Sequence, residues 1–383
     1  MNCFSENKER IIKYLQEGCK PADMPLHFGV ELEHFIVRAD SKEAVLFEGD
    51  GGVEAILKEL APHYKESVYS QGHLIALARE EIALSLEPGA QLEVSISPQT
   101  DVFRIGEIYQ DFYREMVPIL QKYAYEMVTV GYQPKSCVND LGLLPKKRYE
   151  YMDRYFQKIG PWGRRMMRGT ASTQISIDYY SEEDFMRKYR IAYYLKDVLA
   201  CFFSNTHVFE GEPYEGQNLR NTIWSGTDNR RVDVASYLVK GTLSFDAYAE
   251  FVMQAPVIVN KEGDHEYYDE RTIGEIACER VFSKEEMVHA MSMVFPMIRA
   301  KQFLELRFAD SMPMEKVLCY VMVVKGLFAD IAYTEQLIFA EEFETGKADA
   351  KMRCLVQGIA DKLSEAENKW LEDCRLWEWN LQN

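Results

Sequence analysis

The chain has no long apolar run and no paired cysteines, and these absences exclude several classes of protein. No stretch approaches the roughly 20 apolar residues that a membrane-spanning helix needs, and the longest run, 317–327, is interrupted by Lys325. The first 20 residues contain no apolar core of secretory length, so we expect a soluble, cytoplasmic protein. The eight cysteines form neither a Cys-x-x-Cys pair nor a Cys/His cluster, which disfavours a zinc site or a disulfide framework.

Positive charge is also scarce. The 44 Lys and Arg are outnumbered by 61 Asp and Glu, and the net charge of −17 disfavours nucleic acid as a partner. No Gly-x-x-x-x-Gly-Lys-Ser/Thr loop occurs, and no Gly-x-Gly-x-x-Gly follows a predicted strand. A nucleotide would therefore need metal ions and inward-facing arginines to offset the acidic field.

The hydrophobic patterning predicts an α+β protein. No linker or repeat divides the chain, so we expect a single domain over 1–383, with a helical C-terminal portion at about 312–380. The elements lack a regular β-α-β alternation, which favours an antiparallel over a doubly wound parallel sheet. Helices are expected near 7–18, 53–61, 101–127, 183–203, 285–294, 315–343 and 347–378, and strands at 28–38, 90–97, 170–179 and 301–308.

Four predicted strands each carry a polar face. Alternate residues of a strand point to the same side, so Glu31 and Glu33 lie together, opposite Leu32. The simplest interpretation of any one such face is a solvent-exposed surface. Across four strands, however, acid, amide and arginine recur on the polar side. The other polar faces hold Gln91, Glu93, Ser95 and Ser97; Ser172, Gln174, Ser176 and Asp178; and Glu305 with Arg307.

Carboxylates on neighbouring strands repel one another unless cations lie between them, and Mg²⁺ prefers such oxygen ligands. The candidate magnesium ligands are Glu31, Glu33, Glu93 and Glu305. The segment 219–231 adds three arginines and Trp224, and an arginine fork recognises carboxylate or phosphate through two hydrogen bonds. The alternative for this segment is a surface loop with ordinary salt bridges.

Six segments, in order, match a known series of motifs. They are FGVELEHFIV (28–37), LFEGDGGVEAILKELAPHY with GHLIALAREEIALSLEPGAQLEVSISP (46–64 and 72–98), LPKKRYEYM (144–152), MMRGTASTQISIDY (166–179), LRNTIWSGTDNRR (219–231) and VFPMIRAKQFLELRFADSMP (294–313). Together they resemble the glutamate–cysteine ligase family of plants and many bacteria. The resemblance implies the fold shared with glutamine synthetase, in which a curved antiparallel sheet forms a funnel with helices packed outside.

The resemblance also implies a reaction and its residues. The γ-carboxylate of glutamate would be phosphorylated by ATP and then joined to the amine of cysteine, as in glutathione biosynthesis. Mg²⁺ and ATP would be required, and glutamate, cysteine and ATP would be the partners. Carried over by position, Glu31, Glu33, Glu93 and Glu305 would hold Mg²⁺; Arg148, Ser172, Gln174, Arg220 and Trp224 would surround glutamate; and Arg231 and Arg307 would face the transferred phosphoryl group.

The sequence departs from the family pattern at four positions. Ala171 and Ser172 stand where the family often has cysteine and threonine, and Gly226 and Arg230 stand where an acidic residue is common. These departures leave open a γ-glutamyl ligase for another amine. A guanidino-kinase-like phosphotransferase and a catalytically silent regulatory or binding protein are further alternatives. Oligomeric state, redox control, feedback and the division of arginines between glutamate and ATP are also left open.

Overall fold

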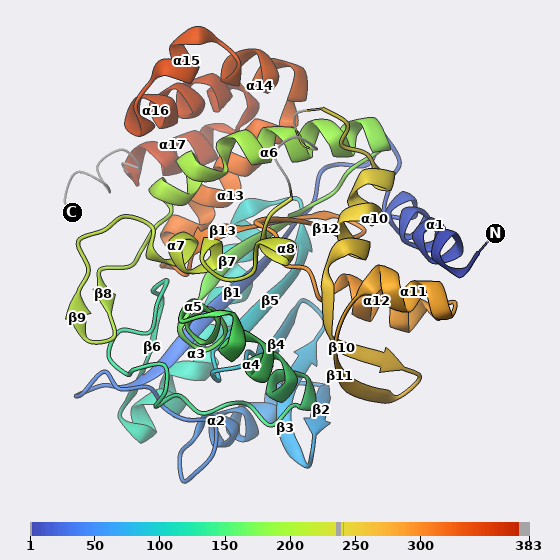
Figure 1. The fold of residues 1–383 in the computed structure, drawn as a ribbon. Helices are drawn as coiled ribbons and strands as arrows, with labels where there is room; N and C mark the ends of the chain where they lie inside the picture. The colour runs from blue at the N-terminus through green and yellow to red at the C-terminus, as the bar shows by residue number, and fades with distance from the viewer. Residues whose placement is uncertain (1, 235–238, 240, 375–383) are drawn as a thin grey trace.

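A nine-stranded antiparallel sheet forms the centre of the protein in the computed structural model, which describes residues 2–234, 239 and 241–374 (Figure 1). Over these residues the sheet extends from β12 at one edge to β2 at the other and does not close into a barrel. The order is β12 (Ile298–Ala300), β13 (Leu304–Asp310), β7 (Ser172–Ile177), β1 (Phe28–Arg38), β5 (Leu92–Gln99), β4 (Ile82–Leu86), β3 (His73–Arg79) and β2 (Glu66–Ser70), while β6 (Tyr125–Val128) pairs with β1.

One face of the sheet is apolar and packs on helices. Leu92, Val94 and Ile96 on β5 are almost completely buried, as the period-2 alternation predicts. α3 (Val102–Tyr123) packs against β5 and β6, and α6 (Glu182–Phe202) packs against β13. Figure 1 shows α6 and α13 (Met314–Ala329) beneath the C-terminal helices α14 (Ile331–Ile338), α15 (Glu341–Thr345), α16 (Ala348–Ile359) and α17 (Glu365–Asp373).

The polar face is covered by shorter elements. α4 (Lys147–Ile159), α5 (Trp162–Arg164) and the π-helical turn at Arg165–Gly169 lead directly into β7. α7 (Leu219–Ser225) and α8 (Asn229–Val232) follow later in the chain. Residues of α4, the π-turn and α7 line a cavity together with the polar strand residues, so this face is enclosed rather than solvent-exposed.

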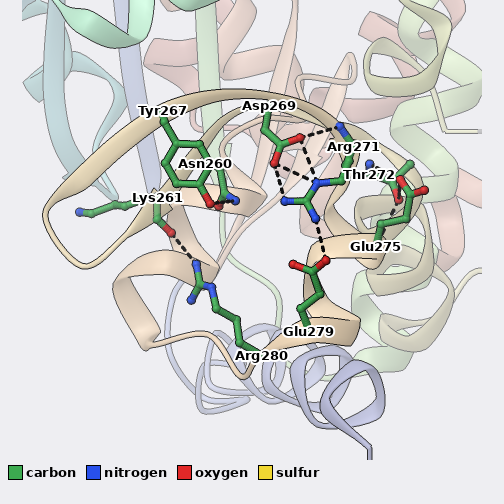
Figure 2. A network of polar contacts seen from close by, with 9 residues as sticks. All are labelled: Asn260, Lys261, Tyr267, Asp269, Arg271, Thr272, Glu275, Glu279 and Arg280. Carbon is green, nitrogen blue, oxygen red and sulfur yellow. Dashed lines mark hydrogen bonds and ion pairs between the residues drawn. The ribbon is translucent and has the colours of Figure 1, made fainter.

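A two-stranded hairpin, β10 (Pro256–Glu262) and β11 (His265–Thr272), is joined to helices beside the cavity. Figure 2 shows Arg271 between Asp269 and Glu279, and Arg280 donating to the Lys261 carbonyl. These contacts attach the hairpin to α11 (Ile273–Glu279), and Arg280 also donates to Glu286 at 2.6 Å on α12 (Lys284–Met291), which leads to the cavity residue Ser292. α1 (Cys3–Gln16) and α10 (Phe245–Gln254) pack against each other on the outside of α11, and α2 (Val53–Leu60) packs on β3.

All four predicted strands are present, and the preference for an antiparallel sheet is confirmed. The predicted helix 315–343 is wrong as a single element, because Asp330 ends α13 and caps α14 by accepting the Tyr333 amide at 3.0 Å. The helix expected at 347–378 is divided into α16 and α17 by a turn at 360–364, and residues 375–380 lie outside the described part. The helix expected at 101–127 is wrong at its end, because α3 stops at Tyr123 and β6 begins at Tyr125; β2–β4 and β12 had no matching prediction.

Within the described residues, no single helix is both long and apolar enough to cross a bilayer. α13 and α14 reach that length only together, and they meet at a bend of 100°.

Candidate active site

The register of the sheet brings the predicted carboxylates onto one face. Glu33 on β1 lies opposite Glu93 on β5, and Glu31 lies opposite Gln174 on β7. Glu305 on β13 lies opposite Ser176, one strand further along. Directly paired residues of neighbouring strands point to the same side of a sheet, so residues distant in sequence form one polar surface.

This surface forms the floor of a cavity of about 300 Å³. The volume lies at the lower end of the range for small-molecule sites and so suits small substrates. Its lining has an acidic, a basic and an apolar part. The lining residues are Glu31, Glu33, Glu87, Gln91, Glu93, Gln174, Arg148, Arg299, Lys301, Arg307, Pro88, Tyr149, Met152, Met166, Met167, Thr170, Trp224, Ser292 and Phe295.

The acidic part is electrostatically unfavourable without a bound cation. Burial, together with the charges of neighbouring carboxylates, raises the pKa of Glu31 and of Glu93 to about 8 and that of Glu87 to about 7. Burial also raises the pKa of Glu33, although Arg220 and Arg307 oppose this. A divalent cation among these side chains would relieve both their mutual repulsion and their loss of hydration.

Glu33 is the carboxylate most firmly held in place. Its carboxylate accepts hydrogen bonds from the Ser172 backbone amide at 2.7 Å and from the Gln174 side-chain amide at 2.9 Å. The backbone carbonyl of Glu33 accepts a further hydrogen bond from the Ser311 hydroxyl at 2.5 Å. Gln174 also donates to the Ser172 hydroxyl at 3.1 Å, so the two predicted substrate residues are joined to this carboxylate. Ser172 itself is fully buried, whereas Gln174 borders the cavity.

The basic part is organised around Glu305. Its carboxylate is fully buried and contacts Arg299, Lys301 and Arg307, each at 2.7 Å. Burial opposes its charge, but Arg299, Arg307 and Lys301 hold the pKa of Glu305 well below its usual range. Glu305 is therefore already neutralised by protein cations, unlike Glu31 and Glu93, and its predicted role as a magnesium ligand stays a prediction.

Arg148 and Trp224 also border the cavity, as the positional transfer predicts. Arg148 donates to the Ser292 hydroxyl at 2.9 Å and to the Ser292 carbonyl at 3.1 Å. Burial lowers the pKa of Arg148. Among the described residues its guanidinium forms no ion pair, so it is available to bind an anionic group of a substrate.

Two of the predicted arginines lie behind the cavity wall. Arg231 is completely buried, pairs with Asp228 at 2.9 Å and donates to the Met293 carbonyl at 2.6 Å. Arg220 is also buried and donates to the Arg307 carbonyl at 2.6 Å, and burial lowers its pKa to about 10. Both hold backbone beside the site, so direct contact with phosphate or glutamate would require these guanidinium groups to leave their present partners.

Several lining residues were missed from the sequence. Arg299 alternates with Ile298 and Ala300 on β12, a strand that was not predicted, and Lys301 lies in the turn before β13, although the predicted strand 301–308 began with it. Glu87 stands in the Glu-Pro-Gly motif but belongs to a turn, where strand alternation makes no prediction. Met152, Met166 and Met167 stand in motif segments that carry the family resemblance, but nothing in the sequence marked them as cavity residues.

The carboxylates share one cavity without forming a closed metal cage. Within the described residues, no three His, Cys, Asp or Glu side chains are grouped so as to hold one metal ion by themselves. This agrees with the chemistry of Mg²⁺, which is commonly held by one or two carboxylates and completed by water and substrate phosphates. The donor set, buried carboxylates with raised pKa values, fits that ion.

Comparison with known proteins gives a consistent family. The model of the glutamate–cysteine ligase family 2 (GCS2) matches residues 27–373. The chain is 27% identical over 342 residues to the chloroplastic glutamate–cysteine ligase A of Oryza sativa subsp. japonica, covering 84% of this chain and 67% of the rice protein. It is 26% identical over 334 residues to the chloroplastic glutamate–cysteine ligase of Arabidopsis thaliana, covering 84% of this chain and 63% of that protein.

A solved structure supports the fold. The glutamate–cysteine ligase of Francisella tularensis, determined in complex with AMP, superimposes with a TM-score of 0.51 at 11% identity. The alignment covers 92% of this chain and 82% of that one. The family match includes every segment that lines the cavity, from Glu31 on β1 to Arg307 on β13. The chain belongs to the glutamate–cysteine ligase family 2.

Proposed function

We propose that the protein joins the γ-carboxylate of L-glutamate to the amine of L-cysteine, using ATP and Mg²⁺ and releasing ADP and phosphate. The observation that carries this proposal is the cavity itself, whose lining brings an acidic row, Glu31, Glu33, Glu87 and Glu93, together with a basic row, Arg299, Lys301 and Arg307, that the buried Glu305 holds in place. The acidic row would hold metal, and the basic row would hold the transferred phosphoryl group. Phosphoryl transfer is catalysed mainly by positioning and charge neutralisation, and this cavity supplies both.

The nucleotide is proposed to enter beside Glu31. A second cavity of about 190 Å³, bordered by Gly29, Ser95, Pro98 and Phe303, shares Glu31 with the first cavity. A nucleotide lying there would direct its terminal phosphate towards the acidic row. The AMP complex of the Francisella enzyme is consistent with nucleotide binding in this fold. In this arrangement the polar sheet face would be the wall of the funnel that the family resemblance implies.

Glu31, Glu33 and Glu93 are proposed to hold Mg²⁺ together with phosphate oxygens. When bound, the ion would neutralise charge on the phosphate oxygens and polarise the phosphorus. Ser172 and Gln174 fix the position of Glu33 through their hydrogen bonds, so we assign Ser172 a positioning role. Glu305 is proposed to orient Arg299, Lys301 and Arg307 towards the cavity.

The chemistry proceeds in two balanced steps. A γ-carboxylate oxygen of glutamate attacks the γ-phosphorus of ATP, the bond to the bridging oxygen breaks, and ADP leaves. Arg307 and its neighbours would stabilise the charge on the transferring group. The amine then attacks the γ-carbonyl carbon of the acyl phosphate, phosphate leaves, and the amine loses a proton to give the amide. No protein nucleophile is required. Arg148, Gln174 and Trp224 would hold glutamate, and Arg220 would support Arg307.

The test is phosphate release from ATP and Mg²⁺ with glutamate, with one amine added at a time. Release that requires both glutamate and an amine, and is fastest with cysteine, supports the proposal. Glutamate-dependent release that is faster with another amine retains the acyl-phosphate chemistry and replaces the acceptor. Phosphorylation of a guanidino compound without glutamate would identify a phosphotransferase, and no turnover at all would identify a silent homologue. The cytoplasmic location stays a prediction.

A further inference from the structure

The edge strand β12 carries two of the three cations of the basic row. Arg299 belongs to the strand and Lys301 follows it directly, and both border the cavity. Among the described residues, β12 pairs with one neighbouring strand, β13, with Arg299 opposite Glu305. Ile298 and Ala300 are each only 2% exposed, and a buried main-chain group needs a hydrogen-bond partner. The outer edge of β12 therefore needs partners that no strand supplies.

Tyrosine hydroxyls meet this outer edge. The Tyr189 hydroxyl donates to the Ile298 carbonyl at 2.9 Å, and the Tyr248 hydroxyl accepts a hydrogen bond from the Ala300 amide at 2.9 Å. Alternate residues of a strand direct their main-chain groups to the same edge, so Ile298 and Ala300 present theirs together. The two hydroxyls thus occupy the place that a further strand would take.

A third tyrosine holds the turn that follows β12. The Tyr179 hydroxyl lies 2.8 Å from the Lys301 carbonyl and 2.6 Å from the Leu15 carbonyl in the last turn of α1. The chain after α1 also packs closely here, since a Cβ added at Gly18 would lie 2.6 Å from the Gln302 Cα. The backbone that carries the Lys301 side chain is therefore tied both to α1 and to the segment after β7.

Tyr179, Tyr189 and Tyr248, which we call the tyrosine clamp, come from three separate segments and meet inside the protein. Tyr189 lies on α6, Tyr248 lies on α10, Tyr179 follows β7, and each is at most 1% exposed. The Phe185 ring contacts all three rings, with centroid distances of 5.4, 5.8 and 6.4 Å. Close packing of this kind leaves a ring little freedom to turn, so each hydroxyl is a fixed point for the main chain.

The tyrosine clamp reaches the cavity through β12 and touches no lining side chain of the acidic row. Glu305 holds the charged ends of Arg299 and Lys301, each at 2.7 Å, whereas the clamp holds the main chain from which these side chains start. Long side chains need both constraints, since an ion pair alone leaves their origin free to shift. A displacement of about 1 Å in a site of this kind costs up to about 10²-fold in rate.

We infer that the three hydroxyls of the tyrosine clamp are positioning groups for the phosphoryl-transfer step, because they keep Arg299 and Lys301 directed into the cavity. This inference rests on the proposed function, which gives the basic row its role. The hold on β12 itself does not depend on that function and is measured separately.

The first measurement compares the full-length wild type with two variants that each lose one oxygen atom. Tyr248→Phe removes the acceptor of the Ala300 amide. Tyr64→Phe is the matched control, because the Tyr64 hydroxyl is buried, lies near β2 at the opposite edge of the sheet, and has no hydrogen-bond partner among the described residues. Hydrogen exchange at the Ala300 amide, followed without substrates, should be at least about fivefold faster in Tyr248→Phe and unchanged in the control.

The second measurement is phosphate release with ATP, Mg²⁺, glutamate and cysteine. In Tyr248→Phe, kcat should fall roughly tenfold while the KM for glutamate stays within about twofold of wild type. The same change made in Arg299→Met should lower kcat by about threefold or less, because the guanidinium that the clamp positions is then absent. Arg299→Met keeps Glu305 paired with Lys301 and Arg307.

Three results would overturn the inference. Unchanged exchange at the Ala300 amide would show that the hydroxyl does not hold β12. Faster exchange with an unchanged kcat, or a tenfold loss of kcat that persists in Arg299→Met, would leave the hydroxyl with a structural role alone. In each of these cases, wild-type turnover that requires glutamate and an amine still supports the proposed function. A wild type without glutamate-dependent phosphate release would overturn the proposed function, and the positioning role with it.

Discussion

Replacing Glu93 by glutamine gives a sharp test of the acidic row, because it should stabilise the folded protein while removing activity. Glu93 has a pKa of about 8 in the folded protein against an ordinary value of 4.5. At about 1.4 kcal/mol per pKa unit, the cost of ionising it would reach roughly 5 kcal/mol. Glu93 is only half-buried and shares the row with other carboxylates, so solvent screens part of its charge and we expect about 2 kcal/mol in practice.

The direction in which stability changes with pH follows from the linkage between protonation of Glu93 and folding. A group whose pKa is raised on folding contributes stability below its unfolded pKa, near 4.5, and this contribution is lost as the pH rises through about 8. Without metal, the wild type should therefore lose unfolding free energy between pH 5.5 and 8.5 relative to Glu93→Gln. The glutamine can still accept the Ser85 hydroxyl, which lies 2.9 Å from Glu93.

The assay is urea unfolding of both proteins in EDTA at the two pH values, followed by phosphate release with Mg²⁺. Glu93→Gln should be more stable than wild type at pH 8.5, and its kcat should fall roughly 10²–10³-fold. Mg²⁺ should raise the midpoint of wild type more at pH 8.5 than at pH 5.5, because it competes with protons. Glu66→Gln, on the exposed edge strand β2, is the control and should change stability by less than about 0.5 kcal/mol. A wild type whose stability relative to Glu93→Gln does not fall with pH would refute the reasoning.

Three further changes test the basic row and the packing behind it. Glu305→Gln should lower the free energy of unfolding in urea by about 3–5 kcal/mol, because three cations lose their shared carboxylate. A decrease of less than about 1 kcal/mol would contradict the assigned ion-pair network. Arg307→Lys should lower kcat by roughly 10²-fold in the phosphate assay while unfolding changes little, since lysine lacks the planar fork; unchanged kcat would remove Arg307 from the mechanism. Gly131→Ala should lower the free energy of unfolding by about 1–3 kcal/mol, measured by thermal unfolding, because the new Cβ would lie 2.2 Å from the Asp310 carboxyl carbon. Gly142→Ala, which has open space around the new Cβ, should be nearly neutral in the same measurement.

Local patterns predicted the parts of the site that depend on a single strand. Glu31 and Glu33 share a face because a strand has a period of two, whatever it later pairs with. The same reasoning placed Ser172 beside Gln174, and Glu305 beside Arg307, before any contact was known. The motif series then supplied the order of these strands along the chain and the family to which they belong.

Turns and irregular segments were beyond such reasoning. Glu87 enters the cavity from a turn, and Met166 and Met167 enter from a π-helical turn, so neither periodicity applies to them. The break at Asp330 was missed for a related reason. Apolar residues continue on both sides of Asp330. Only the hydrogen bond from the Tyr333 backbone amide to the Asp330 carboxylate marks the start of the new helix.

The sequence by itself determined which side chains share a strand face, the antiparallel class of the sheet and the family, because these follow from near-neighbour spacing and from motifs in order. Tertiary structure alone decided that the polar face is enclosed, that Glu93 lies opposite Glu33, and that Glu305 is neutralised by three cations while Glu31 is not. The physical reason is that strand register and helix packing join residues tens to hundreds of positions apart. Charge, burial and pKa depend on those distant neighbours, and no local pattern specifies them.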